Sequence, residues 1–164
     1  MTGHSYQEME TSELRVPADP NYVIVAKRAT MAFGAVYGFG VDQLDELMIA
    51  VAQACENAIA TTEQFSHAGC GCGQLRLTFT HEEDRLEVRV RSVCSREALE
   101  AIAAQRAVAV AKARARIADQ QAQELLAATD LALKLTGLFV DQCAWRVDER
   151  AGGLSVRLTK YRIS

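Results

Sequence analysis

The chain has 164 residues, of which 49% are hydrophobic and 24% charged, and its formal net charge is −3 at pH 7. This length and composition suit one compact domain with a full core and exclude an intrinsically disordered chain. The acidic balance argues against direct nucleic-acid binding, which depends on a basic surface. No apolar run approaches the roughly 20 residues of a membrane span, so we expect no membrane insertion.

The N-terminal segment is polar and carries acidic residues, without the apolar stretch that marks a secretory signal peptide. We expect residues 1–12 to form a flexible tail and residues 13–164 to form a single domain. Five cysteines are an odd number in a chain without an export signal. This favours reduced thiols and a cytoplasmic location.

The first part of the chain predicts one strand and two helices. Residues 12–16 alternate as a short strand, and Asn21 is placed to cap a helix that runs to about Tyr37. A second helix begins at Asp42 and ends within residues 61–64. Its apolar residues recur at helical spacing along one face: Leu44, Leu47, Met48, Val51, Cys55 and Ala58.

The middle of the chain predicts a hairpin followed by a long helical segment. Residues 75–79 and 86–90 alternate apolar with polar side chains, and the acidic tetrad 81–84 joins them as a turn. Residues 96–140 are rich in Ala, Leu, Gln and Arg and contain no Pro. The segment is long for one helix, so we expect two or more pieces with a break between about residues 117 and 129.

The end of the chain predicts a second hairpin, formed by residues 143–147 and 154–161. Trp145 is expected in the core because it lies on the apolar side of its alternating strand. Strands in hairpins and helices in separate runs together predict an α+β two-layer sandwich.

Four segments in this order carry a resemblance to a known family. They are 16–23 (VPADPNYV), 47–59 (LMIAVAQACENAI), 85–90 (RLEVRV) and 156–161 (VRLTKY). Together they resemble the anti-sigma serine kinases of the SpoIIAB/RsbW type, in the GHKL (histidine-kinase-like) ATPase superfamily. The resemblance implies the Bergerat fold, a mixed or antiparallel sheet under a helical layer. It also implies a homodimer that binds an RNA polymerase sigma factor and, in many members, phosphorylates an anti-anti-sigma factor.

The resemblance further implies an ATP site that uses a Glu and an Asn on the second helix, one turn apart. The matching residues here are Gln53 and Asn57. In the family the Asn oxygen holds Mg²⁺ and the Glu is the general base. Asn57 keeps that chemistry, whereas the amide of Gln53 is a very weak base, a loss that commonly costs about 10²–10⁴ in rate. These two side chains lie opposite the apolar stripe and form either a solvated polar face or a wall of the ancestral pocket.

Two further nucleotide elements of the family are changed. Ser92 stands where an Asp reads adenine, and Cys94 stands at the following Gly. The glycine-rich phosphate turn matches residues 129–135, which contain no glycine, and Asp130 would repel phosphate. The segment 97–126 replaces the lid, and it either plugs the pocket or forms a binding arm.

These changes predict an anti-sigma factor without kinase activity and without a bound cofactor. The alternative is an active serine/threonine kinase that uses Mg-ATP with Asn57. A third hypothesis is a metal, redox or small-ligand sensor, with His67, Cys70 and Cys72 as ligands in a glycine loop. A metal site would need about four ligands, and incidental thiols are the alternative for this loop.

Lys27 aligns with a basic residue that family members use on the sigma factor, and Arg28 is its neighbour. The resemblance therefore implies that both residues bind the partner. The alternative is that they are solvated surface cations.

Overall fold

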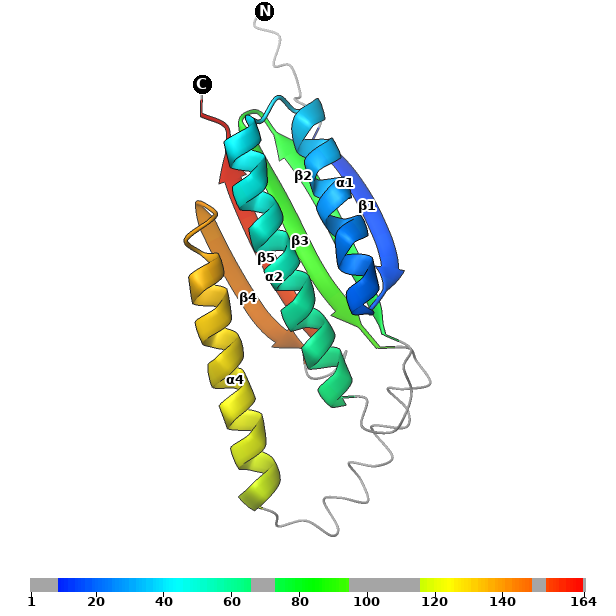
Figure 1. The fold of residues 1–164 in the computed structure, drawn as a ribbon, viewed down its shortest axis with the longest axis vertical. Coiled ribbons are helices and arrows are strands. Elements are labelled where there is room, and N and C mark those ends of the chain that lie inside the picture. Colours follow the sequence, from blue (N-terminus) through cyan, green and yellow to red (C-terminus); the bar gives the residue numbers. More distant parts are fainter. Residues whose placement is uncertain (1–8, 66–72, 95–115, 149–152, 164) are drawn as a thin grey trace, which may run out of the picture.

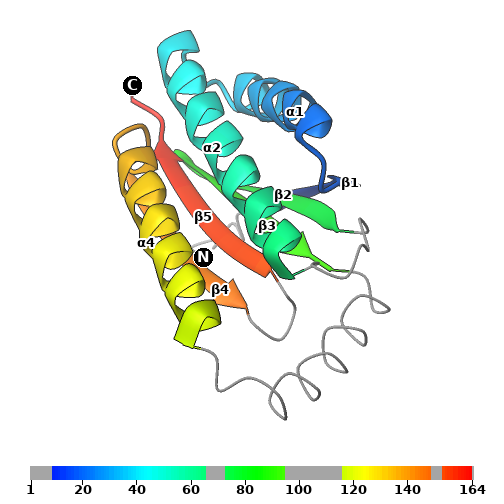
Figure 2. The same cartoon turned by 60° about the horizontal axis from the view of Figure 1, so that its bottom comes forward.

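The computed structural model describes residues 9–65, 73–94, 116–148 and 153–163. Over these residues the fold is an α+β two-layer sandwich, as predicted, and it is compatible with a GHKL-like architecture. Three α-helices lie side by side on one face of a five-stranded antiparallel sheet (Figure 1). The other face of the sheet is not covered by a described helix, as the turned view makes plain (Figure 2).

The sheet has the strand order β1-β2-β3-β5-β4. Its strands are β1 (Glu10–Pro17), β2 (Gln74–Glu82), β3 (Arg85–Val93), β4 (Gln142–Asp148) and β5 (Gly153–Tyr161). All neighbouring strands pair antiparallel, so both predicted hairpins are confirmed. Glu10 to Ser12, which we expected in the flexible tail, instead pair with β2, because β2 extends to Glu82 and offers them backbone partners.

The helical layer consists of α1 (Val23–Val36), α2 (Val41–Phe65) and α4 (Arg116–Thr136). A 3-10 turn, Pro20–Tyr22, precedes α1, and the Asp19 carboxylate accepts a hydrogen bond from the Asn21 N–H at 2.8 Å. Asp19 therefore caps the 3-10 turn, which begins three residues before α1, and the predicted cap Asn21 lies inside that turn. No described helix is long and apolar enough to cross a membrane.

Helix α4 contradicts the predicted break between residues 117 and 129. It runs without interruption from Arg116 to Thr136 and ends before Gly137. The physical reason is that residues 116–136 contain neither Gly nor Pro, so strong helix formers carry the helix through.

The core lies between the two layers. Its sheet side consists of fully buried apolar residues of the three central strands: Leu75, Leu77, Phe79, Leu86, Val88, Val90, Leu154, Val156 and Leu158. Helix α2 packs on β3 and β5, with α1 on one side of it and α4 on the other. Because α2 is flanked on both sides, Ala50 and Ala54 are also fully buried, and its buried face is wider than the predicted stripe.

Candidate functional site

The ridge of α2 that carries Gln53 and Asn57 faces β5 and the end of α4. Its orientation is fixed by Glu46, whose carboxylate accepts a hydrogen bond from Lys160 Nζ of β5 at 2.5 Å. Lys160 Nζ also donates to the carbonyl of Phe139, just after α4, at 3.1 Å. Gln53 and Asn57 follow Glu46 by about two and about three helical turns, so they lie on the same side of α2.

Both amides on this ridge are half-buried. The side-chain nitrogen of Asn57 is buried and has no hydrogen-bond partner among the described residues. Leaving such a group unpaired costs on the order of 1–3 kcal/mol. Asn57 therefore has an unused polar group in the region where the resemblance implies a metal-bound nucleotide.

Ser92 lies on the helix-covered face at the end of β3 and is almost fully buried. Its hydroxyl accepts a hydrogen bond from the Leu154 N–H at 2.9 Å. A side chain at Gly153 would place its Cβ 2.1 Å from the Ser92 carbonyl oxygen, so the start of β5 lies directly against this residue. In the described structure Ser92 thus ties β3 to β5.

The residues that match the phosphate turn lie well inside α4. Thr129 and Leu133 are buried on the inner side of the helix, and Asp130 is ion-paired with Lys134 at 2.6 Å. Backbone N–H groups bind phosphate at a helix N-terminus, where the first four have no intrahelical partner. Residues 129–135 are far from the start of α4, so their N–H groups are engaged within the helix.

Of the described cysteines, Cys55 and Cys94 are buried and Cys143 is half-buried. Burial raises the pKa of each thiol, to about 12 for Cys55. Such thiols stay protonated at neutral pH and are poor nucleophiles. The proposed sensor loop with His67, Cys70 and Cys72 lies outside the described residues. Within the described part of the chain, no group of three or more His, Cys, Asp or Glu side chains could hold a metal ion.

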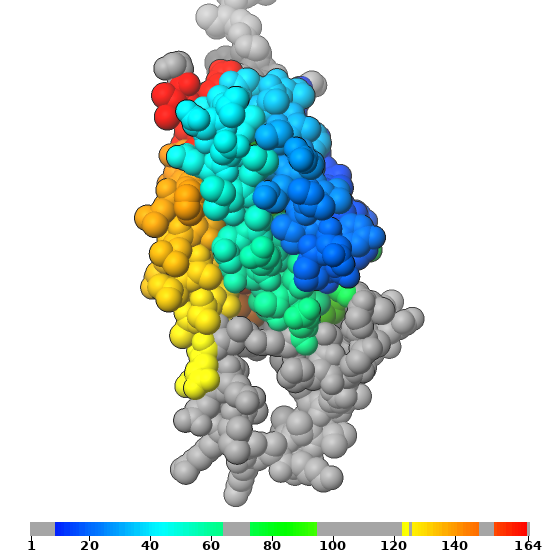
Figure 3. Space-filling view, viewed as in Figure 1, coloured from blue at the N-terminus to red at the C-terminus, as the bar shows by residue number. Residues whose placement is uncertain are grey.

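Lys27 and Arg28 lie on α1, at one side of the helical layer (Figure 3). Lys27 is half-buried and Arg28 is exposed, and no ion pair forms on either within the described part of the chain. The outer side of α1 also exposes large apolar side chains, including Ile24 at 52% and Val36 at 79%. At helical spacing Val25 and Val36 share one side of α1, and Arg28 lies about one turn after Val25.

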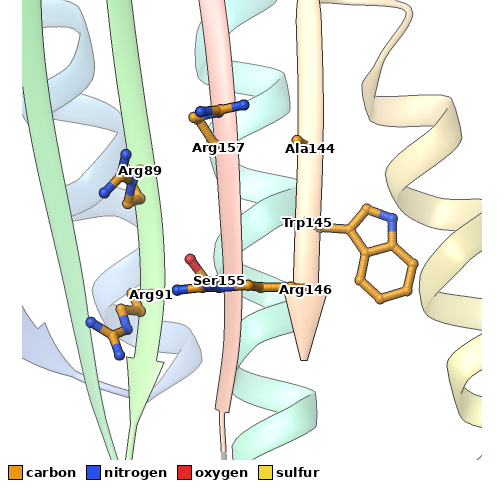
Figure 4. A pocket seen from close by; sticks show the side chains of 7 residues that line it. All are labelled: Arg89, Arg91, Ala144, Trp145, Arg146, Ser155 and Arg157. Atoms are coloured by element: carbon orange, nitrogen blue, oxygen red, sulfur yellow. The ribbon is translucent and has the colours of Figure 1, made fainter. Parts of the chain in front are cut away.

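Sequence reasoning missed one feature, a shallow cavity of about 330 Å³ on the open face of the sheet (Figure 4). Its lining residues come from β3, β4 and β5: Arg89, Arg91, Ala144, Trp145, Arg146, Ser155 and Arg157. The signal was present as an Arg at alternate positions of several predicted strands. Only the strand order and register, which join residues far apart in the sequence, bring these side chains together.

Comparisons with known proteins place the resemblance on about half of the chain. No protein-family model matches. The chain is 35% identical over 78 residues to the serine-protein kinase RsbW of Bacillus subtilis, covering 48% of this chain and 46% of that protein. The serine-protein kinase RsbW of Halalkalibacterium halodurans is 33% identical over 81 residues, 49% of this chain and 46% of that protein. The chain thus spans about half the length of the curated relatives it matches.

Proposed function

We propose that this protein is an anti-sigma factor that binds an RNA polymerase sigma factor through α1, as a homodimer and without kinase activity. The similarity to RsbW proteins supports the class of protein. The observation that carries the binding claim is the outer surface of α1, where the exposed apolar side chains of Ile24 and Val25 lie one turn before the exposed Arg28. Apolar area beside unpaired cations is the composition of an interface core and its rim.

Helix α4 offers a useful contrast, because it also exposes apolar side chains, Leu131 and Leu135 among them. Its cation Lys134 is already paired with Asp130 at 2.6 Å. An acidic partner therefore gains more from α1, where no described carboxylate pairs with Lys27 or Arg28. We place the sigma-factor contact on α1 for this reason.

The absence of kinase activity is supported by three positions. Gln53 cannot serve as a general base, and the Ser92 hydroxyl accepts the Leu154 N–H. The stretch 129–135 offers phosphate no free backbone N–H groups. Asn57 alone fits the family's way of holding Mg-ATP, so we derive no phosphoryl-transfer step for this chain.

The alternative is an active serine/threonine kinase that phosphorylates an anti-anti-sigma factor. It is favoured by the similarity to RsbW proteins, which are serine-protein kinases, and by the buried side-chain nitrogen of Asn57, which has no partner among the described residues. In this case Asn57 would hold the Mg²⁺ of Mg-ATP, and a base outside the family pattern would be required. Transfer of phosphate from labelled ATP to a partner protein, lost in Asn57→Ala, would establish this alternative.

The binding claim is tested with the sigma factors of the source organism, each purified and titrated into the full chain by calorimetry. We expect one of them to bind, and Arg28→Glu to weaken that binding at least 10-fold, because an acidic partner then meets a like charge. The matched control is Lys134→Glu on α4, which should leave the affinity within twofold. Binding by no sigma factor, or equal affinity for Arg28→Glu and the wild type, would overturn the proposal.

A further inference from the structure

The open face of the sheet brings arginines directly opposite one another on neighbouring strands. The register pairs Arg15 with Arg76, Arg76 with Arg91, and Arg89 with Arg157. Like charges at directly opposed positions destabilise an antiparallel pair. Stability alone does not explain three such pairs in a chain whose net charge is negative.

The compensation of these charges is uneven across the sheet. At the β1 edge, Glu13 forms ion pairs with both Arg15 and Arg76. On the β5 and β4 side, Arg157 and Arg146 are exposed and form no ion pair within the described residues. Arg89 of β3 is ion-paired with Glu87 at 3.0 Å, so the positive charge that lacks a described carboxylate at this end of the face is that of Arg157 and Arg146.

That end coincides with the cavity described above. Figure 4 shows the arginine side chains coming from three adjacent strands, with Arg146 extending from β4 across Ser155 of β5 toward Arg91. No Asp or Glu is among the described residues that line the cavity. The Ser155 hydroxyl adds a neutral donor between the guanidinium groups.

We propose that this cavity is a binding site for a small ligand that carries condensed phosphate groups. A guanidinium presents several N–H donors in a planar fork that matches phosphate oxygens, and several such forks here face one cavity. The compact charge favours a small polyanion over a long one, because Glu13 already neutralises the β1 and β2 end. The volume of the cavity, about 330 Å³, is at the lower end of the range for small-ligand sites.

This site is separate from the α2 ridge that carries Asn57. Successive side chains of a strand point to opposite faces, so Ser155 and Arg157 face the open side while Leu154 and Val156 face the helices. The ring of Trp145 points away from the arginines, toward α4 (Figure 4). No aromatic ring in the cavity is therefore placed to stack on a nucleotide base, and the site recognises phosphate charge alone.

The source of the condensed phosphate is either an inorganic polyphosphate or the phosphate chain of a nucleotide. The titration uses sodium tripolyphosphate, and ATP without Mg²⁺ in a parallel arm. Equal affinity for the two shows recognition of the phosphate chain alone. An affinity for ATP more than 10-fold tighter, and lost in Asn57→Ala rather than in Arg157→Gln, would overturn the proposal, because it would place binding on the helical side.

The decisive variants are Arg157→Gln and the double variant with Arg146→Gln. We expect tripolyphosphate binding to weaken at least 10-fold in the single variant and to be undetectable in the double variant. The matched control is Arg15→Gln, because Arg15 lies on the same face but is already paired with Glu13. Its affinity for tripolyphosphate should stay within twofold of that of the wild type. Equal weakening in Arg15→Gln and Arg157→Gln would mean diffuse attraction to the whole face, and would overturn the claim of a site.

Three further results would also reject the proposed phosphate site. They are no binding of tripolyphosphate by the wild type at millimolar concentration, tighter binding of an oligoglutamate peptide than of tripolyphosphate, or a circular dichroism spectrum showing that Arg157→Gln is unfolded. None of these results bears on the sigma-factor claim, which is tested on α1. Failure of the one proposal is therefore distinguishable from failure of the other.

Discussion

The helix-covered face and the open face of the sheet are built from the same five strands, yet they differ in how polar groups are treated. On the covered face, Ser92 bonds to the Leu154 N–H and Lys160 bonds to Glu46 and to the Phe139 carbonyl. On the open face, Arg89 lies directly opposite Arg157. Ser92 and Lys160 are thus paired on the covered face, although the buried side-chain nitrogens of Asn57 and His81 there have no partner among the described residues. The open face instead keeps like charges directly opposed, which is the arrangement that the proposed ligand site would explain.

The largest expected effect comes from the apolar core of the covered face. Phe79 is fully buried and its ring stacks on Phe33, with the ring centroids 4.6 Å apart. Phe79→Ala should lower the free energy of unfolding by about 3–5 kcal/mol, because it leaves a cavity. Urea denaturation measures this. The control is Thr78→Ala, at the residue just before Phe79, which lies on the open face. A change beyond about 0.5 kcal/mol in its free energy of unfolding would contradict the contrast between the two faces.

The next effect depends on pH. Burial raises the pKa of the Cys55 thiol to about 12 in the folded state, against about 8.5 in an unfolded chain. The folded state therefore retains a proton that the unfolded state loses, so stability is constant below about pH 8 and falls as the pH rises toward 12. At pH 10 the wild type should have lost about 2 kcal/mol more than Cys55→Ala. Parallel pH profiles for the two proteins would show that the thiol is not buried in solution.

These first effects could be anticipated from the sequence, since they rest on local periodicity. Alternation with period two identified the buried side of β2, β3 and β5, and helical periodicity identified the buried side of α2. Neither signal contains the strand order or the register. The pairing of Arg89 with Arg157 joins positions far apart in the chain, so no local pattern could reveal it.

The errors also have physical causes. The break expected in α4 was inferred from segment length, but the absence of Gly and Pro allows one continuous helix. Ala50 lies outside the predicted apolar stripe of α2, yet it is fully buried, because α4 packs on that side of α2. The α2 ridge with Gln53 and Asn57 was found from the family resemblance, and its buried, unpaired amide emerged only in three dimensions.

A smaller effect on stability is expected from the ion pair of a buried lysine on the covered face. Lys160 is buried, and its Nζ lies 2.5 Å from the Glu46 carboxylate. Glu46→Gln should lower the free energy of unfolding by about 1–2 kcal/mol, because a charged hydrogen bond is replaced by a neutral one. Glu56→Gln, at an exposed position of the same helix, is the control. Equal, negligible effects in thermal melts of both variants would mean that Lys160 is satisfied without Glu46.

The smallest expected effect has the opposite sign. Arg157→Gln removes a like-charge pair with Arg89 and should raise the free energy of unfolding by about 0.2–1 kcal/mol at low salt. The gain should shrink at 1 M salt, where exposed charges are screened. Chemical denaturation at the two salt concentrations measures it. Destabilisation by this variant would show that Arg157 contributes to the fold rather than to binding.

The central claim, sigma-factor binding without use of ATP, is tested most directly by one titration performed in two conditions. The cognate sigma factor is titrated into the full chain by calorimetry, first in buffer alone and then with saturating Mg-ATP. We predict a complex in both conditions, with dissociation constants within twofold of each other, because the proposal places the contact on α1 and holds that Gln53, Ser92 and residues 129–135 no longer bind nucleotide. A complex that forms only with Mg-ATP, or one that Mg-ATP tightens more than 10-fold, would contradict the account.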